Sequence, residues 1–145
     1  MSKGKKLFKK IGGTVLYILI VVLLVYYTPK ALSYALNTQY PMAAITSGSM
    51  WPELKKGDLV FIQGVEPSSI QVDDIVVYTN TKNAFTIHRV VQLREDTLIT
   101  KGDANNVNDD PVAYQDIVGK LYKIGDWNTR IPKLGLISIS INRNP

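Results

Sequence analysis

Three separate stretches of this chain carry the residue types that hydrolytic chemistry needs. The only histidine, His88, lies in the strand-like run AFTIHRVVQL at residues 84–93. Residues 46–53 (TSGSMWPE) place two serines around a glycine, and residues 100–111 (TKGDANNVNDDP) collect three carboxylates in a polar loop. A histidine titrates near neutral pH, so it can accept a proton from a hydroxyl and return it later. If the three stretches converge, they supply the nucleophile, base and acid of a Ser-His-Asp arrangement.

Each stretch also has a structural interpretation. A single histidine is commonly a satisfied core or surface residue, and Ser-Gly-Ser occurs in ordinary turns. Asp and Asn in a loop often cap their own backbone. A calcium loop is another alternative for residues 100–111, but the acidic positions lack the alternating ligands and terminal Glu of an EF-hand. With one histidine and no cysteine in the chain, we expect no metal site and no cofactor.

The N-terminus has the pattern of a membrane anchor. Residues 1–10 contain five lysines and no acidic residue, and residues 11–27 (IGGTVLYILIVVLLVYY) form an uncharged run that ends in two tyrosines. Seventeen residues is near the lower limit for a helix that crosses a bilayer. The lysines predict a cytoplasmic N-terminus, and the paired tyrosines suit the opposite interface. A cleavable signal peptide is the alternative, but the run exceeds the roughly 7–15 residues of its apolar region, so we favour a retained anchor.

Charge beyond the tail is balanced. Outside the first ten residues, twelve basic side chains are matched by twelve acidic ones. The excess positive charge therefore belongs to the tail and not to the domain, and we expect no nucleic-acid partner. The partner that the tail and the apolar run imply is the lipid bilayer.

The rest of the chain has the periodicity of a β domain. Residues 28–41 (TPKALSYALNTQYP) predict a juxtamembrane connector with room for a short helical turn, and residues 42–145 predict an extracytoplasmic domain. Short β-branched or aromatic runs, spaced by about ten residues, predict a mostly β fold behind one N-terminal transmembrane helix. These runs are residues 58–63, 74–78, 85–93, 97–100 and 117–124. The last apolar stretch, residues 131–141, is too short to span a membrane.

Four boxes that follow one another behind the anchor resemble those of a known family. The stretches SGSMWP (47–52), IHRV (87–90) and KGDAN (101–105), with Asp109 six residues after Asp103, are similar to the signature boxes of the type I signal peptidases. The likeness is to the Ser-His branch, which is found in archaea, in some Gram-positive bacteria and in the endoplasmic-reticulum complex. It extends over most of the chain, and it implies a signal-peptidase-like β domain.

The resemblance implies a role for three residues of the first two boxes. Ser49, directly before the Met-x-Pro, matches the family's nucleophile. Ser47 would help to bind the oxyanion, together with the backbone N–H of Ser49. His88 occupies the position where another branch of the family has a lysine base. Because a histidine does not need the desolvation that a lysine base needs, we expect activity that persists toward neutral pH.

The two acidic positions of the last box match Asp103 and Asp109. Asp109 is our first choice as the partner of His88, and a slip of one loop residue would exchange it with Asp110. One departure from the family pattern is VDDI at residues 72–75, where a glycine commonly precedes the aspartate. We expect a changed turn there and no effect on the chemistry.

The substrates that the resemblance implies are secretory preproteins. The chain would be a membrane-anchored serine endopeptidase that removes signal peptides by cutting after small residues, in the pattern A-x-A. Small pockets lined by residues such as Ile45 and Val60 would select these residues. We expect a single pass through a cell membrane, or through the endoplasmic-reticulum membrane if the source is eukaryotic, with the N-terminus cytoplasmic and the catalytic domain outside. Further membrane subunits are candidate partners.

Two alternatives remain open. One is a Ser-Lys peptidase of the same broad fold, in which Lys82 or Lys101 is the base and His88 is dispensable. The other is a non-catalytic β domain that is anchored to the membrane and acts as an adaptor. Cleavage of a precursor by the solubilised protein alone would separate an enzyme from an adaptor.

Overall fold

A computed structural model of the protein describes residues 3–125 and 127–141. Two compact units are present, Met1–Ala35 and Leu36–Pro145. The first two residues of the predicted tail and the last four of the predicted domain lie outside the described residues.

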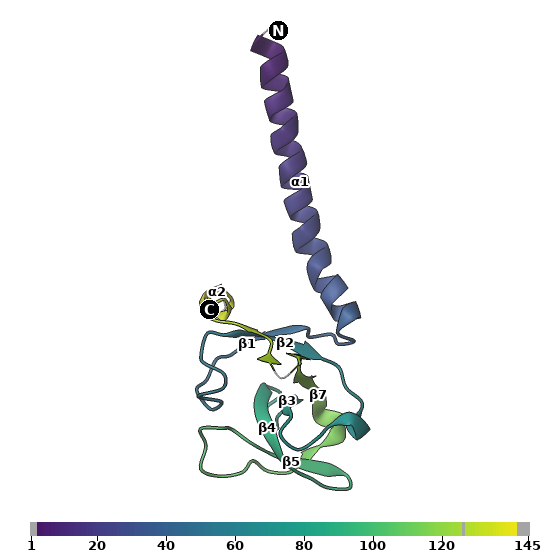
Figure 1. Ribbon diagram of the computed structural model, residues 1–145, viewed down its shortest axis with the longest axis vertical. Helices are drawn as coiled ribbons and strands as arrows, with labels where there is room; N and C mark the ends of the chain where they lie inside the picture. The colour runs from purple at the N-terminus through teal and green to yellow at the C-terminus, as the bar shows by residue number, and fades with distance from the viewer. Residues whose placement is uncertain (1–2, 126, 142–145) are drawn as a thin grey trace. The chain divides into compact units, whose positions relative to one another are not determined.

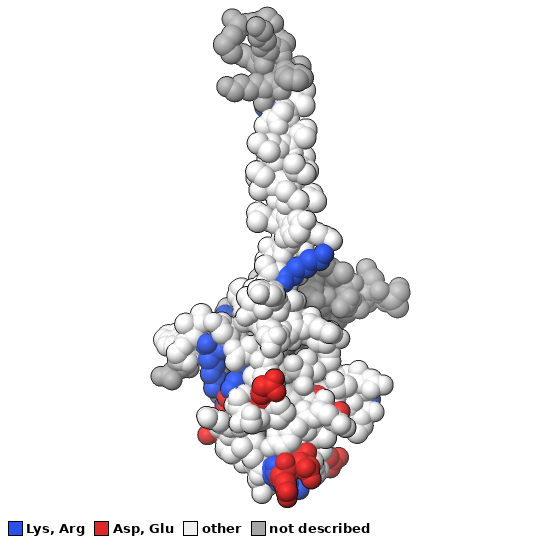
Figure 2. All heavy atoms as spheres, turned by 90° about the vertical axis from the view of Figure 1, so that its right-hand side faces the viewer, with Lys and Arg blue, Asp and Glu red and all other residues white. Residues whose placement is uncertain are grey.

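The first unit is one helix, α1 (Lys3–Ala35), which is longer than the predicted span. Its segment Lys10–Ala35 is long and apolar enough to cross a membrane. Figure 2 shows the helix surface as white along most of its length, because no charged residue lies between Lys10 and Lys30. The predicted connector therefore begins as helix: α1 passes through Pro29 and ends at Ala35. Ala and Leu residues after the proline favour this continuation.

The second unit is mostly β, as its periodicity predicted. All five predicted runs are strands, within one or two residues of their expected ends, although the last is divided into two. The longer strands are β2 (Leu59–Gln63), β3 (Ile75–Thr79), β4 (Phe85–Leu93), β5 (Thr97–Lys101) and β7 (Ile117–Leu121). The second part of the last predicted run is β8 (Lys123–Ile124). The sequence pattern did not reveal the other short strands, which are β1 (Met42–Ala44), β6 (Val112–Ala113), β9 (Trp127–Asn128) and β10 (Arg130–Ile131).

The strands form a curled antiparallel sheet with the order β1-β2-β7-β3-β4-β5-β6, and β10 also pairs with β2 (Figure 1). Strands β8 and β9 form a separate hairpin. The nine-residue strand β4 pairs with β3 on one side and with β5 on the other. Its pairing with β5 shifts register between Val90 and Gln92, which marks a bulge, and a bulge bends a strand. β4 is thus a long central strand from which successive residues can reach different parts of the domain.

Two apolar clusters fill the domain. Neighbouring residues of β3 belong to different clusters, Ile75 to one and Val76 to the other, because side chains alternate across a strand. The first cluster is Ile45, Met50, Leu54, Val60, Ile75 and Leu121. The second is Ile70, Val76, Tyr78, Val90, Leu98 and Val112. Each joins residues that are distant in sequence, from strands and from the segments between them.

A short helix, α2 (Gly135–Ile141), follows β10. The sequence predicted only a broken apolar stretch here. The helix contacts β1, and its first residue, Gly135, lies against the backbone just before β2: a Cβ atom there would lie 2.6 Å from the carbonyl oxygen of Asp58. Such a distance is shorter than real Cβ atoms show, so glycine is needed at this contact.

Candidate active site

Ser49 lies in a tight turn after β1, where the chain has left the sheet. The N–H of Trp51 donates to the carbonyl oxygen of Gly48, which closes the turn, and the N–H of Ala104 donates to the carbonyl oxygen of Ser49 over 2.8 Å. The second bond ties the serine to the loop of the KGDAN box. A Cβ atom on Gly102 would lie 2.7 Å from that same carbonyl oxygen. The glycine of this box therefore allows the loop to approach the serine closely.

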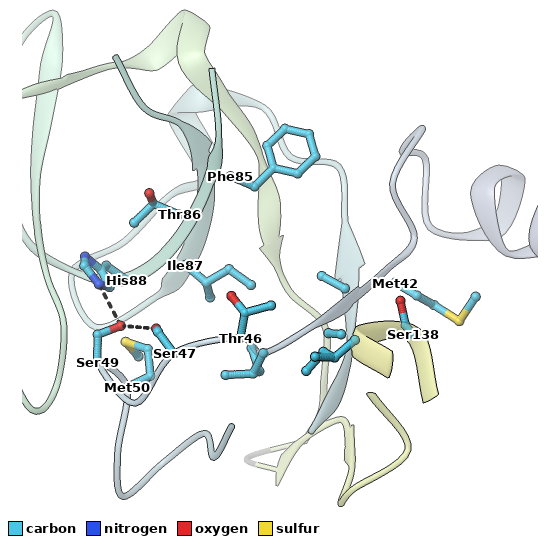
Figure 3. A pocket seen from close by; sticks show the side chains of 14 residues that line it. Met42, Thr46, Ser47, Ser49, Met50, Phe85, Thr86, Ile87, His88 and Ser138 are labelled. Carbon is cyan, nitrogen blue, oxygen red and sulfur yellow. Dashed lines mark hydrogen bonds between the residues drawn. The ribbon is translucent and has the colours of Figure 1, made fainter. Parts of the chain in front are cut away.

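His88 lies at the middle of β4, opposite Val76 of β3, and only 7% of its surface is exposed. Its Nε2 atom is 3.1 Å from Ser49 Oγ, and its Nδ1 atom is 2.6 Å from Asp109 Oδ2. An ionised carboxylate can only accept, so the ring carries its proton on Nδ1 and leaves Nε2 to accept from the serine hydroxyl. Figure 3 shows the ring beside the two serines, with Ser49 between His88 and Ser47.

The same oxygen of Asp109 has two further partners. Thr100 Oγ1 donates to it over 2.7 Å, and the hydroxyl of Tyr78 donates over 3.3 Å. Burial raises the pKa of Tyr78, the neighbouring Thr100 hydroxyl lowers it by a smaller amount, and the nearby carboxylate of Asp109 raises it further. The phenol therefore stays protonated and remains a donor at neutral pH.

Asp103, the other predicted acid, has a different partner. Its two carboxylate oxygens accept from Nε and a terminal nitrogen of Arg89, over 2.8 and 2.7 Å. The hydrogen bond to Asp103 raises the pKa of Arg89, against the smaller effect of burial. Because neighbouring side chains of β4 point to opposite faces, His88 and Arg89 reach different aspartates. The structure thus brings Asp109 to the imidazole and Asp103 to the guanidinium, while Asp110 is exposed.

Ser47 lies at the mouth of the site and is exposed, and its hydroxyl oxygen is 3.0 Å from Ser49 Oγ. Among residues 3–125 and 127–141, the backbone N–H of Ser49 donates no hydrogen bond. A hydroxyl and a free N–H therefore lie beside the hydroxyl that would attack, as an oxyanion site requires.

A cavity of about 670 Å³ opens at Ser49 and His88. It lies between β1 and the first half of β4, and α2 contributes residues to its far wall (Figure 3). We refer to it as the groove; its lining residues are Met42, Ala43, Ala44, Ile45, Thr46, Ser47, Ser49, Met50, Phe85, Thr86, Ile87, His88, Ser138 and Ile139.

The lining of the groove can be compared with the two pocket residues expected from the sequence, Ile45 and Val60. Ile45 lines it, but the expectation for Val60 was wrong: that side chain is fully buried in the core beneath. Val60 pairs with Ala43 of β1, and it is β1 that lines the groove. Neither Lys82 nor Lys101 lines the groove, and Ser49 Oγ has its hydrogen bonds with Ser47 and His88. Within the described part of the chain, no cluster of three His, Asp or Glu residues could hold a metal ion.

Sequence reasoning missed the residues that hold the site in place. These are Tyr78, Arg89, Thr100, Gly102 and Ala104. Gly102 and Ala104 belong to the KGDAN box and Arg89 follows the histidine, so their positions carried a signal. Thr100 and Tyr78 are ordinary strand residues by type, and their contacts with Asp109 depend on how the strands pair.

The departure from the family pattern before Asp74 has a structural counterpart. Asp73 adopts a φ of 74°, in the left-handed region that glycine adopts most readily. Its carbonyl oxygen accepts a hydrogen bond from Arg89 over 3.1 Å. The turn therefore has a geometry for which a glycine is suited, and Asp is among the residues that tolerate it.

A curled β domain that carries a Ser-His-Asp hydrogen-bond chain in a groove, behind a helix able to cross a membrane, defines a membrane-anchored serine peptidase. Comparison with known proteins makes the class more specific. The chain is 34% identical over 125 residues to the signal peptidase complex catalytic subunit SEC11 of Eremothecium gossypii, with 79% of this chain and 74% of that protein covered. The corresponding protein of Lachancea thermotolerans is 35% identical over 126 residues, with 79% of this chain and 74% of that protein covered. That of Neurospora crassa is 34% identical over 125 residues, with 80% of this chain and 72% of that protein covered.

None of the protein-family models compared with the chain matches it. The identity to these relatives, over more than two thirds of each, shows that the chain belongs to the type I signal peptidases, with catalytic subunits of the signal peptidase complex among its relatives. The resemblance drawn from the sequence boxes is thereby confirmed.

Proposed function

We propose that this chain is a membrane-anchored serine endopeptidase that removes signal peptides from secretory preproteins. The observation that carries the proposal is the hydrogen-bond chain from Ser49 through His88 to Asp109, at the wall of the groove. It occurs in a member of the signal peptidase family. Similarity alone would allow a non-catalytic homologue, but the geometry supplies the parts of an acyl-transfer site.

In the proposed mechanism, Ser49 Oγ attacks the carbonyl carbon of the scissile peptide bond. Its proton passes to Nε2 of His88, 3.1 Å away, and the ring becomes an imidazolium. The carboxylate of Asp109, in contact with Nδ1, stabilises that positive charge and keeps Nε2 free to act first as acceptor and then as donor. The imidazolium then protonates the leaving amine, and the acyl group remains on Ser49.

The oxyanion of the tetrahedral intermediate would accept from the N–H of Ser49 and from the hydroxyl of Ser47. Loss of one such donor typically lowers the rate by about 10²–10³. Water then takes the place of the amine: it gives a proton to His88, attacks the ester carbonyl and releases the acid, and the proton returns to Ser49. No cofactor takes part in this sequence.

Asp103 acts indirectly in this proposal. Its pairing with Arg89 ties the loop of residues 101–105 to β4, and Ala104 of the same loop holds the carbonyl oxygen of Ser49. The aspartate would thus fix the distance between the serine's turn and the histidine's strand. We assign it a positioning role and not a place beside the ring.

The groove suits an extended peptide with small side chains. Its floor near Ser49 is made by Ala43, Ala44 and Ile45, and Ile87 borders it on the β4 side. β1 lies at one end of the strand order, so a substrate strand can add to it by main-chain hydrogen bonds. Walls that include Ala43, Ala44 and Ile45 would favour small apolar residues, as in the A-x-A pattern before the cut.

We also propose the arrangement of the chain at the membrane. Residues 1–10 would lie in the cytoplasm, residues 11–27 would cross the bilayer, residues 28–41 would lead out of it, and residues 42–145 would form the catalytic domain on the opposite side. The membrane would be that of the endoplasmic reticulum if the source is eukaryotic, and otherwise the cell membrane. Because related proteins are subunits of a complex, we propose further membrane subunits as partners, besides the lipid bilayer and signal-peptide substrates.

The experiment that tests the function is cleavage of a purified preprotein by the detergent-solubilised full chain, with the product identified by mass spectrometry. We expect the wild type to cut after an A-x-A site, and Ser49→Ala and His88→Ala to be inactive. Ser68→Ala, at an exposed serine of the short 3-10 helix Pro67–Ser69 that does not line the groove, is the matched control and should cleave like the wild type.

Three outcomes would contradict the proposal in different ways. Cleavage by His88→Ala at a substantial rate would mean that the base lies elsewhere, as in a Ser-Lys peptidase. Activity of His88→Lys equal to that of the wild type would show that the imidazole is not needed. An inert wild type that is folded, tested with and without native membranes, would indicate the adaptor.

A further inference from the structure

We propose that Thr100, assisted by Tyr78, is a positioning residue that selects Asp109 as the partner of His88 and fixes which carboxylate oxygen faces the ring. This inference rests on the proposed function, because it concerns the proton path of the same site. Neither residue touches the groove or the attacking hydroxyl, so neither is a catalytic residue.

Thr100 holds Asp109 at two points. Its carbonyl oxygen accepts from the N–H of Asp109 over 2.8 Å, and its hydroxyl donates to Asp109 Oδ2 over 2.7 Å. The threonine has no exposed surface, and it pairs with Val90, two residues after the histidine, on the neighbouring strand. The residue that holds Asp109 therefore belongs to the same sheet as His88.

Asp109 needs this support because its surroundings do not confine it. Its side chain is 23% exposed and borders a second hollow of about 600 Å³, in which Asp110 is also found. Water in that hollow competes for the carboxylate, and the neighbouring aspartate offers a chemically identical one. The hydroxyls of Thr100 and Tyr78 both donate to Oδ2 of Asp109 and so set the rotation of this carboxylate. They favour Asp109 over Asp110 as the partner of the imidazole.

The consequence for the imidazole is direct. With Oδ2 held 2.6 Å from Nδ1, the ring carries its proton on Nδ1 and turns a bare Nε2 to Ser49. If the carboxylate can rotate toward water, the tautomer with the proton on Nε2 becomes populated, and that tautomer cannot accept the serine proton. The fraction of competent sites falls, while the groove that binds the peptide is unchanged.

The kinetic test uses Thr100→Val, which keeps the branched shape of the side chain and removes the hydroxyl. We expect kcat for preprotein cleavage to fall about 10- to 100-fold with little change in KM, in line with the loss of a hydrogen bond to a charged group. Thr100→Ser, which keeps the hydroxyl, should recover most of the rate. Tyr78→Phe should lose less than Thr100→Val because its bond of 3.3 Å is longer.

The matched control is Thr97→Val, the same change on the same strand at a residue whose side chain makes no hydrogen bond within the described chain. We expect wild-type kinetics. If Thr100→Val does not fold, Thr100→Ala can replace it, because it also leaves Oδ2 without this donor. The same fall in kcat is expected. An unchanged kcat in a folded Thr100 variant that lacks the hydroxyl would overturn the inference.

A second measurement does not depend on catalysis. His88 is the only histidine, so labelling with ¹⁵N-histidine gives NMR signals from this one ring, and the two nitrogens report which of them carries the proton. We expect a proton on Nδ1 in the wild type, in Thr100→Ser and in Thr97→Val, and a mixture of tautomers in Thr100→Val. If no variant changes the tautomer, the inference is wrong even if the enzyme is active. If the tautomers change as expected while the wild type cleaves nothing, the inference stands and the proposed function fails.

Discussion

Replacing Asp109 by asparagine should be much less damaging than replacing it by alanine, and the reason is visible in the hydrogen bonds. All three donors around this carboxylate, from His88, Thr100 and Tyr78, meet on the single oxygen Oδ2. An asparagine can leave its carbonyl oxygen at that point and place its NH₂ group where the other oxygen was. The ring then keeps its proton on Nδ1, and only the negative charge beside the imidazolium is lost.

The magnitude follows from that charge. Two unit charges about 4 Å apart attract by about 4 kcal/mol at an effective dielectric constant near 20, which corresponds to roughly 10³ in rate. Because the side chain of Asp109 is 23% exposed, water compensates part of this attraction. We therefore expect Asp109→Asn to lower kcat about 10²- to 10³-fold. Asp109→Ala also loses control of the tautomer, and we expect a loss near 10⁴-fold, the size typical of a triad with the wrong tautomer.

The assay is single-turnover cleavage of a preprotein with enzyme in excess, so that product release does not contribute. Asp103→Asn is the comparison variant for the histidine signal and not for the rate, since it makes the same change six residues away on a carboxylate that binds Arg89 and positions the serine's turn. It should lower the free energy of unfolding by about 1–3 kcal/mol, as expected for a partly buried ion pair, without changing the histidine NMR signal. Equal losses for Asp109→Asn and Asp109→Ala would refute the argument from the shared oxygen.

Three further predictions follow from other contacts. Gly102→Ala places a Cβ atom 2.7 Å from the carbonyl oxygen of Ser49, so kcat should fall at least about tenfold; unchanged kinetics would show that the loop can move away at no cost. Burial raises the pKa of Asp58, but hydrogen bonds from the Lys55 N–H, the Arg130 side chain and the Lys133 backbone together lower it below its usual 3.8. Its carboxylate therefore stabilises the fold above that pH and ceases to do so as the pH falls through the lowered pKa. Urea unfolding should accordingly show wild type more stable than Asp58→Asn at pH 7, with a difference that shrinks below about pH 4; a constant difference would contradict this. Asp73→Gly, at a φ of 74°, should leave cleavage unchanged and raise the free energy of unfolding by up to about 1 kcal/mol, measured by thermal unfolding, and a loss of stability would show that the turn prefers aspartate.

Much of the architecture could be predicted from the sequence because it depends on local composition. An uncharged run behind five lysines is enough to predict an anchor, since the cost of placing a charge in lipid acts on each residue separately. The β-branched runs predicted every long strand, because alternation of side chains is a property of a single strand. The end of α1 was not predicted, because helix-forming residues after Pro29 outweighed the proline. Short strands such as β1 were also missed, since three residues carry too little pattern.

The candidate site also has a part that the sequence predicts and a part that depends on the tertiary structure. By itself, the sequence determined which residues could act: one histidine, a serine in a glycine turn, and a loop with three acids. Only the tertiary structure decided that Asp109 meets His88 while Asp103 meets Arg89, because this choice depends on the two faces of β4 and on where the loop crosses them. The tertiary structure alone also revealed Thr100 as the support of Asp109, since a hydroxyl on a strand has no distinguishing pattern until strand pairing places it against a carboxylate.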